Sequence, residues 1–72
     1  MIKINGVKVD VSEIKLSDYL ADNGYIISRI VIELNGDILP RESYDTTILK
    51  ENDKVEILTF VGGGWYRNST KR

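Results

Sequence analysis

The chain has 72 residues, of which 42% are hydrophobic and 29% are charged, a balance typical of one small globular domain. It contains no cysteine and no histidine, which excludes disulfides, thiolate nucleophiles and the side chain that most often binds metals or acts as a general base. Because so short a chain has one thin core and no room for a deep pocket, we expect neither an enzyme nor a metal site.

The charge is unevenly distributed along the chain. Residues 1–64 contain seven Lys/Arg and eleven Asp/Glu, a net charge of −4, whereas residues 65–72 contain three basic side chains and no acidic one. An acidic body is unsuited to nucleic-acid backbones and favours a partner with a basic docking face. The chain has neither an apolar run of about 18 residues nor a signal-peptide pattern. We therefore expect a cytoplasmic monomer that binds neither nucleic acid nor membranes.

The first predicted element is a β-hairpin over residues 2–11. Apolar and polar residues alternate around Asn5-Gly6, a dipeptide that tolerates the positive φ angles of a type I′ turn. With this turn Ile4 faces Val7, and the lysines fall on the opposite face. The apolar face is predicted to contain Ile2, Ile4, Val7, Val9 and Val11.

A short helix is predicted from Leu16 to the residues before Gly24. Its apolar stripe consists of Leu16, Tyr19 and Leu20. Asp18 lies in the first turn, where the helix dipole favours an acid, and Gly24 is suited to end the helix. Two or three turns are marginal in isolation, so packing on a sheet must stabilise this helix.

A second hairpin is predicted where residues 30–34 turn at Asn35-Gly36 into Ile38 and Leu39. Pro40 follows and cannot donate to a strand ladder, which predicts an edge position. The inward side chains of the first strand are expected to be Ile30, Ile32 and Leu34. The connections are a loop or single turn at 42–45, an apolar link at 48–49 and a polar turn at 51–53.

The last predicted strand covers residues 54–61. Its alternation separates two faces, with Val55, Ile57 and Thr59 on one and Glu56, Leu58 and Phe60 on the other. If the first face covers the helix, Leu58 and Phe60 stand outward side by side. We interpret these two side chains as the centre of a partner-docking surface.

Three consecutive glycines, Gly62, Gly63 and Gly64, follow this strand. Glycine loses the most conformational entropy on ordering, so such a run is not expected to form a regular element. It suits either a flexible linker or a thin peptide tail that threads into another protein's active site. We predict a domain at 1–61, a flexible tail at 62–64 and a basic extension at 65–72.

The order of hairpin, helix and returning strands predicts an α+β fold with the helix on one face of a mixed sheet. The sequence also resembles the ubiquitin-like β-grasp sulfur carriers, and within them the ThiS family. The resemblance covers residues 1–64 without a large gap. It is most specific in Asn-Gly-x-Ile-x-Pro-Arg at 35–41 and Asp-x-Val-Glu-Ile-x-x-Phe-Val-Gly-Gly-Gly at 53–64.

This resemblance implies a ubiquitin-like β-grasp and a carrier that binds no cofactor itself. The Gly64 carboxylate would be adenylated by a ThiF-like enzyme that uses ATP, while Gly62 and Gly63 thread into that enzyme. A sulfur donor enzyme would supply the sulfur of a thiocarboxylate, which passes to a ThiG-like thiazole synthase in thiamine synthesis. The missing cysteine and histidine agree with this role, because the chain end carries the sulfur.

The extension is the main departure from this family pattern. Trp65 and the residues after it hold the Gly64 carbonyl in a peptide bond, so no carboxylate is available there. The extension is removed, is foreign to the native protein, or belongs to a member with another role. Two alternatives to the thiamine carrier are a molybdopterin-type sulfur carrier and a ubiquitin-like binding module that does not use its terminus.

Overall fold

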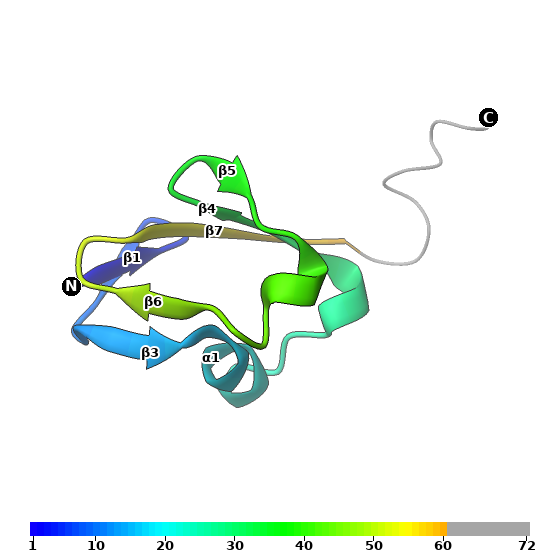
Figure 1. Ribbon diagram of the computed structural model, residues 1–72, viewed down its shortest axis with the longest axis horizontal. Coiled ribbons are helices and arrows are strands. Elements are labelled where there is room, and N and C mark those ends of the chain that lie inside the picture. Colours follow the sequence, from blue (N-terminus) through cyan, green and yellow to red (C-terminus); the bar gives the residue numbers. More distant parts are fainter. Residues whose placement is uncertain (61–72) are drawn as a thin grey trace.

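The computed structural model describes residues 1–60, which form a mixed β-sheet with one helix packed on one face (Figure 1). The strands are β1 (Ile2–Ile4), β2 (Val7–Val9), β3 (Glu13–Lys15), β4 (Ile30–Leu34), β5 (Asp37–Ile38), β6 (Ile48–Lys50) and β7 (Lys54–Thr59). The helix α1 (Leu16–Asp22) follows β3, and short 3₁₀ turns occur at Ile27–Arg29 and Arg41–Ser43. This is the predicted α+β class.

The main sheet has the strand order β2-β1-β7-β4-β5, so the last strand of the chain is its centre. β7 pairs in parallel with β1 and antiparallel with β4. A parallel pair needs a long crossover, which the chain between the two strands supplies. The mixed sheet and the edge position of β5 were both predicted from the sequence.

Both Asn-Gly dipeptides form the predicted hairpin turns. Asn5 and Gly6 have φ angles of 51° and 81°, and Asn35 and Gly36 have φ angles of 53° and 93°. The first hairpin has the expected register, in which Ile4 pairs with Val7 and Ile2 with Val9. Positive φ at both central residues gives a turn whose twist matches that of the flanking strands.

The asparagine side chains of these two turns also bind the backbone of β7. The Asn5 Oδ1 accepts a hydrogen bond from the Ile57 N–H at 2.7 Å, and the Asn35 Oδ1 accepts one from the Lys54 N–H at 2.9 Å. Asn35 Nδ2 also donates to the Asp53 carboxylate at 3.0 Å. Each turn therefore connects its own hairpin to the central strand.

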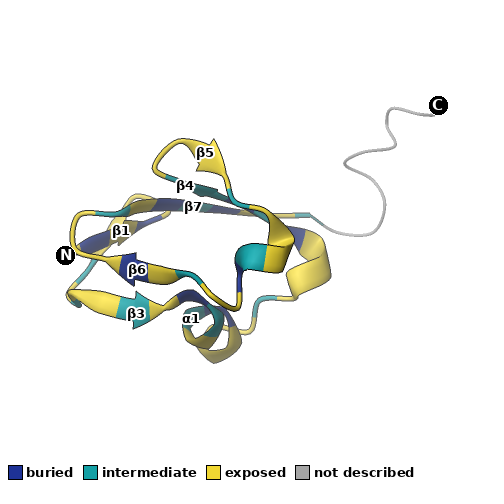
Figure 2. Cartoon of the chain, in the orientation of Figure 1, coloured by how far each residue is buried: buried dark blue, intermediate teal, exposed yellow. Residues whose placement is uncertain are grey.

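The core lies between α1 and the inner face of the main sheet, with β3 and β6 beside the helix (Figures 1 and 2). Its buried apolar residues are Ile2, Ile4, Leu16, Leu20, Ile30, Ile32, Tyr44, Leu49, Val55 and Ile57. α1 begins at Leu16, whose N–H donates to the Thr47 carbonyl at 3.0 Å. It ends as predicted before Gly24, which has a φ angle of 73°.

One part of the sequence prediction was wrong. Residues 48–49 belong to β6, which pairs with β3 in a second, two-stranded sheet, rather than to an irregular link. Each of these strands has three residues. The equally short β1 and β2 were recognised because an Asn-Gly turn joins them, whereas β3 and β6 are far apart in the sequence. Val7 and Thr59 lie on the predicted faces, opposite the buried Ile4 and Ile30. They are nevertheless exposed, because Val7 lies on an edge strand and Thr59 at the end of β7.

We predict that removing the Asn5 side chain destabilises the fold through β7. Asn5→Gly keeps the positive φ and removes the hydrogen bond to Ile57, so the free energy of unfolding should fall by about 1–2 kcal/mol. Asn5→Ala should cost roughly 1 kcal/mol more, because alanine resists this backbone conformation. Urea unfolding of both variants measures the two effects separately. Wild-type stability of Asn5→Gly would contradict the role given to the hydrogen bond.

Candidate functional site

The outer face of the sheet carries an apolar area where β7 ends. Leu58 is 54% exposed, and its Cα partner on β4 is the half-buried Val31. A shallow depression of about 440 Å³ is lined by Val31, Leu58, Thr59 and Phe60. We call the set Val31, Leu58 and Phe60 the apolar exit surface, since the chain leaves the sheet beside it.

Phe60 is held at the end of the strand rather than projecting freely. Its N–H donates to the Arg29 carbonyl at 3.0 Å, which adds one backbone bond beyond the last residue of β7. The residue is half-buried and also lines a second depression of about 190 Å³, together with Gly24, Tyr25, Ile26, Arg29, Ile30 and Thr59. Phe60 therefore lies between two surface depressions, and the backbone is fixed up to this residue.

The structure places the two predicted docking residues differently. Leu58 stands outward, as the alternation along β7 predicts, whereas Phe60 is half-buried beside the end of β4. Their role in docking stays a prediction. The predicted tail Gly62, Gly63 and Gly64 and the extension 65–72 lie outside the described residues.

Sequence reasoning did not assign Val31 or the turn Ile27–Arg29 to this site. Val31 is an outward residue of β4, so the alternation along that strand was the signal, but its position beside Leu58 depends on the order of strands in the sheet. Ile26 and Ile27 are 56% and 39% exposed beside the second depression. No periodic pattern marks these two residues, because they belong to an irregular connection.

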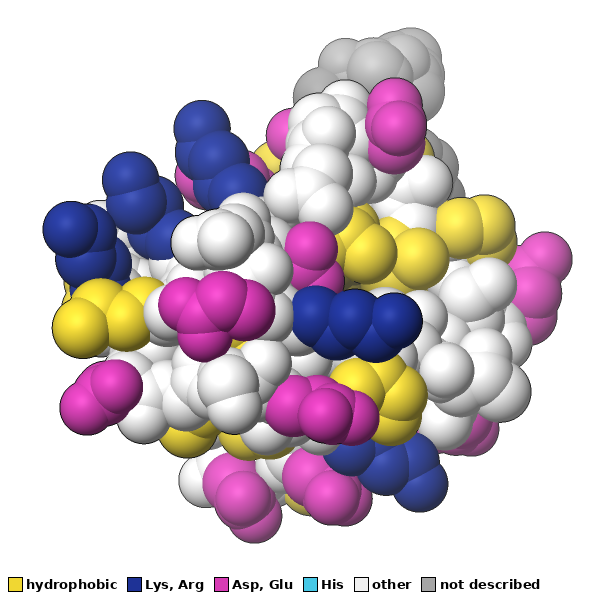
Figure 3. Space-filling model, turned by 60° about the vertical axis from the view of Figure 1, so that its left-hand side comes forward, with side chains coloured by type: hydrophobic (Ala, Val, Ile, Leu, Met, Phe, Trp, Pro, Cys, Tyr) yellow, Lys and Arg dark blue, Asp and Glu magenta, His cyan; other side chains and the backbone are white. Residues whose placement is uncertain are grey.

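Away from this end of β7 the outer face carries charged side chains and the exposed Ile38 of β5, which pairs with Glu33. Glu56 on β7 is paired with Glu33 on β4, and both are half-buried next to the apolar exit surface. At the opposite end of β7, Lys3, Lys8 and Lys54 surround a depression of about 360 Å³. Figure 3 shows basic side chains gathered at the upper left of this end of the molecule.

The described residues contain none of the usual catalytic arrangements. Among residues 1–60 there is no cluster of acidic residues, histidines or cysteines that could hold a metal ion, nor a helix long and apolar enough to cross a bilayer. Burial raises the pKa of the Tyr19 phenol, and the nearby Tyr25 adds to that rise. Tyr19 is therefore protonated at neutral pH and unavailable as a base. The site consists of a partly exposed apolar surface where β7 ends.

The family model and the solved structure that match this chain both carry the name ThiS. The model of the ThiS family matches residues 2–64. The chain is 41% identical over 64 residues to the uncharacterized protein ycf40 of Porphyra purpurea, which covers 88% of this chain and 90% of that protein. A crystal structure of the thiamine biosynthesis protein ThiS from Geobacter metallireducens superposes with a TM-score of 0.68 at 34% identity, covering 88% of this chain and 97% of that one.

A further match is to a segment of a longer protein. The chain is 36% identical over 45 residues to a thiazole synthase of Paramagnetospirillum magneticum, covering 62% of this chain. Those residues are only 14% of that protein. A segment similar to this small domain therefore occurs within a chain named for thiazole synthesis.

Proposed function

The chain belongs to the ThiS family, whose members are small sulfur carriers rather than enzymes, and we propose that it carries sulfur for thiamine thiazole synthesis on a chain end at Gly64. The observation that carries this proposal is the exit of the chain at Phe60. A rigid central strand ends beside an apolar surface, and the family match stops at the third glycine, four residues later.

The chemistry needs a chain end and no reactive side chain. The Gly64 carboxylate attacks the α-phosphorus of ATP and releases pyrophosphate, which turns a poor electrophile into an acyl-adenylate. A sulfur nucleophile at the oxidation level of hydrosulfide then attacks the acyl carbon, and AMP leaves with the electron pair of the broken carbon–oxygen bond. The product is a thiocarboxylate, and the thiocarboxylate is the sulfur donor in thiazole formation.

One feature of the structure and one of the sequence support this use of the chain end. The backbone is held by β4 as far as Thr59 and by the Arg29 carbonyl at Phe60, so a partner that contacts the apolar exit surface receives the tail from a fixed point. Gly62, Gly63 and Gly64 have no side chains, and a narrow channel in the partner admits them while excluding bulkier residues. The docking surface and the tail together fix where the carboxylate lies, which is the requirement for its activation.

The partners follow from the same steps. We propose a ThiF-like enzyme that binds the ATP and adenylates the chain end, a sulfur donor enzyme, and a ThiG-like thiazole synthase that consumes the thiocarboxylate. The matching segment inside a thiazole synthase of Paramagnetospirillum magneticum supports the last of these. The carrier itself needs no bound cofactor, and we propose that it acts in the cytoplasm.

The extension must be absent when the carrier is active. In the 72-residue chain the free carboxylate belongs to Arg72, and Gly64 is bonded to Trp65. A channel shaped for glycine excludes the indole and the phenol that follow. We therefore propose that a chain ending at Gly64 is the active form, either after proteolysis or because the extension is foreign to the native protein.

We predict that a 1–64 chain supports ATP–pyrophosphate exchange by the adenylating partner and that the 72-residue chain does not. The truncation should keep the fold, because it retains the whole core described in residues 1–60. Gly63→Ala in the 1–64 chain is the control for the channel and should reduce exchange strongly. Equal exchange by the two lengths would contradict the need for a carboxylate at Gly64.

A second measurement tests the carrier role in the native cell. Intact mass of the isolated protein should correspond to a chain ending at Gly64, with a fraction heavier by the difference between sulfur and oxygen. If the protein retains residues 65–72 during thiamine synthesis, the chain instead acts as a binding module and the proposed function is wrong.

We predict that Leu58→Ala and Phe60→Ala, each in the 1–64 chain, raise the KM for exchange by about tenfold, as expected when an interface anchor worth about 1.4 kcal/mol is lost. Leu58→Ala should leave the fold nearly unchanged, because the side chain is 54% exposed. Val7→Ala is the matched control, since Val7 is 65% exposed on the edge strand β2. An effect of Val7→Ala as large as that of Leu58→Ala would contradict a docking surface at the chain exit.

A further inference from the structure

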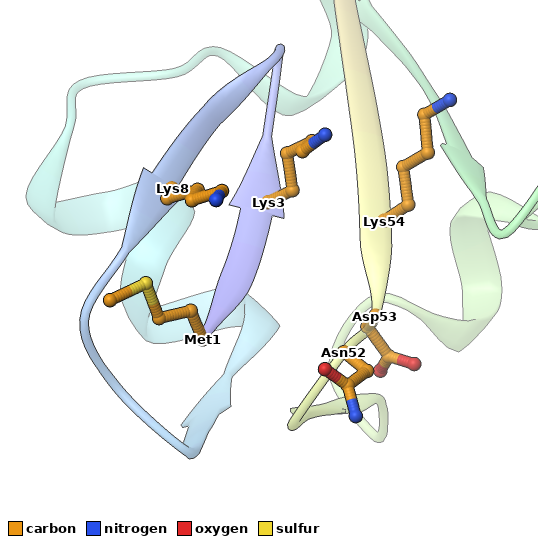
Figure 4. Close-up of a pocket in the computed structure, with 6 residues that line it drawn as sticks. All are labelled: Met1, Lys3, Lys8, Asn52, Asp53 and Lys54. Atoms are coloured by element: carbon orange, nitrogen blue, oxygen red, sulfur yellow. The ribbon is translucent and has the colours of Figure 1, made fainter.

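Three lysines on neighbouring strands form a basic surface at the end of the sheet opposite the chain exit. They are Lys8 on β2, Lys3 on β1 and Lys54 on β7, and they project from one face of the sheet (Figure 4). We propose that this lysine surface binds an acidic segment of the protein that adenylates the chain end. The identity of the partner rests on the proposed function. The inference that the ligand is acidic rests on the described residues alone.

The register of the sheet brings the three positive charges together. Lys3 and Lys8 are directly opposite in the antiparallel pair, and Lys3 and Lys54 are partners in the parallel pair. Like charges opposite each other on a sheet reduce its stability. The three neighbouring lysines therefore lower the stability of the free protein. A negatively charged partner that covers them would give this arrangement a function.

No ion pair neutralises these lysines within residues 1–60, although Asp53 lines the same depression. The Asp53 carboxylate accepts hydrogen bonds from Asn35 Nδ2 at 3.0 Å and from the Lys50 N–H at 2.8 Å, so both of its oxygens hold the turn before β7. Glu51 forms an ion pair with the amino group of Met1. In the described part of the chain, no carboxylate lies within ion-pair distance of Lys3, Lys8 or Lys54.

The surroundings select a short acidic peptide rather than a long polyanion. Glu56 and its partner Glu33 occupy the next outward row of the face, roughly 7 Å along the strands from Lys54. A nucleic-acid backbone that followed the face would meet these carboxylates, and the net charge of residues 1–64 is −4. A cluster of two or three acidic side chains fits the depression of about 360 Å³ without reaching them.

The position of the surface explains why the partner that takes the chain end would use it. Lys54 begins β7 and Thr59 ends it, so the lysine surface and the chain exit are roughly 17 Å apart. A standard protein interface of about 800 Å² on each partner is wide enough to span both. The partner would then hold the domain at two points, with the charged contact away from the reacting carboxylate.

Titration of the ¹⁵N-labelled 72-residue chain with a hexaglutamate peptide tests the chemistry without any enzyme. We expect shifts at the backbone amides of residues 3, 8 and 54, and about fivefold weaker binding to Lys3→Gln/Lys8→Gln. Lys15→Gln/Lys50→Gln removes the same charge from exposed lysines of β3 and β6 and should bind the peptide normally. Equal weakening in both double variants would overturn the lysine surface.

The same titration with inorganic phosphate and with a ten-residue oligothymidylate tests whether the lysine surface prefers another anion to the acidic peptide. The proposal requires that the peptide shifts these amides at a lower concentration than either competitor. Stronger binding of phosphate or of the oligonucleotide would overturn the assignment to an acidic peptide.

Pyrophosphate exchange then tests the assignment to the adenylating partner. In the 1–64 chain, Lys3→Gln/Lys8→Gln should raise the KM about fivefold at low salt with kcat unchanged, and added salt should reduce this difference. Lys15→Gln/Lys50→Gln should match the unaltered chain. Normal exchange by the unaltered 1–64 chain together with equal KM values for both double variants would overturn this inference and leave the proposed function intact. Absence of exchange by the unaltered chain would overturn the proposed function and, with it, the choice of partner.

Discussion

The fold depends on the hydrogen bonding of β7 to both of its neighbours. β7 is the last strand in the sequence and the central strand of the sheet, so the sheet is incomplete until the whole domain has been formed. The contacts that hold it are long-range, since Asn5 and Ile57 are 52 residues apart. Closing so long a loop costs entropy before any contact is gained, and the two hairpin asparagines help to offset that cost.

The same strand carries the core on one face and the candidate docking surface on the other. Val55 and Ile57 are buried against the helix side, whereas Leu58 faces solvent. A shift of one residue in register would exchange these faces. The hydrogen bonds from Asn5 to Ile57 and from Asn35 to Lys54 therefore stabilise the domain. They also fix the register that places Leu58 on the outer face.

Much of this arrangement was predictable from the sequence, because local chemistry decides it. The two Asn-Gly turns, the apolar stripe of the helix and the alternation along β7 each depend on a few neighbouring residues. The β3–β6 pair could not be predicted, since its strands have three residues each and, unlike β1 and β2, no Asn-Gly turn joins them. The site was only partly predictable for another reason. Leu58 follows from alternation, whereas its neighbour Val31 and the grouping of Lys3, Lys8 and Lys54 follow from the order of strands.

The parallel pairing of β1 with β7 also determines where a second protein can be attached. Because the two strands run in the same direction, Met1 lies beside the start of β7, where the Asn52 N–H donates to its carbonyl at 2.9 Å. A dye, an affinity tag or a whole domain fused to the amino terminus would therefore sit at the far end of the sheet from the chain exit. Such a fusion would remove the exposed ion pair between Met1 and Glu51. Exposed ion pairs contribute little to the free energy of unfolding. Immobilisation through the amino terminus would thus be remote from the end of β7 but would crowd the lysine surface, whose depression Met1 lines.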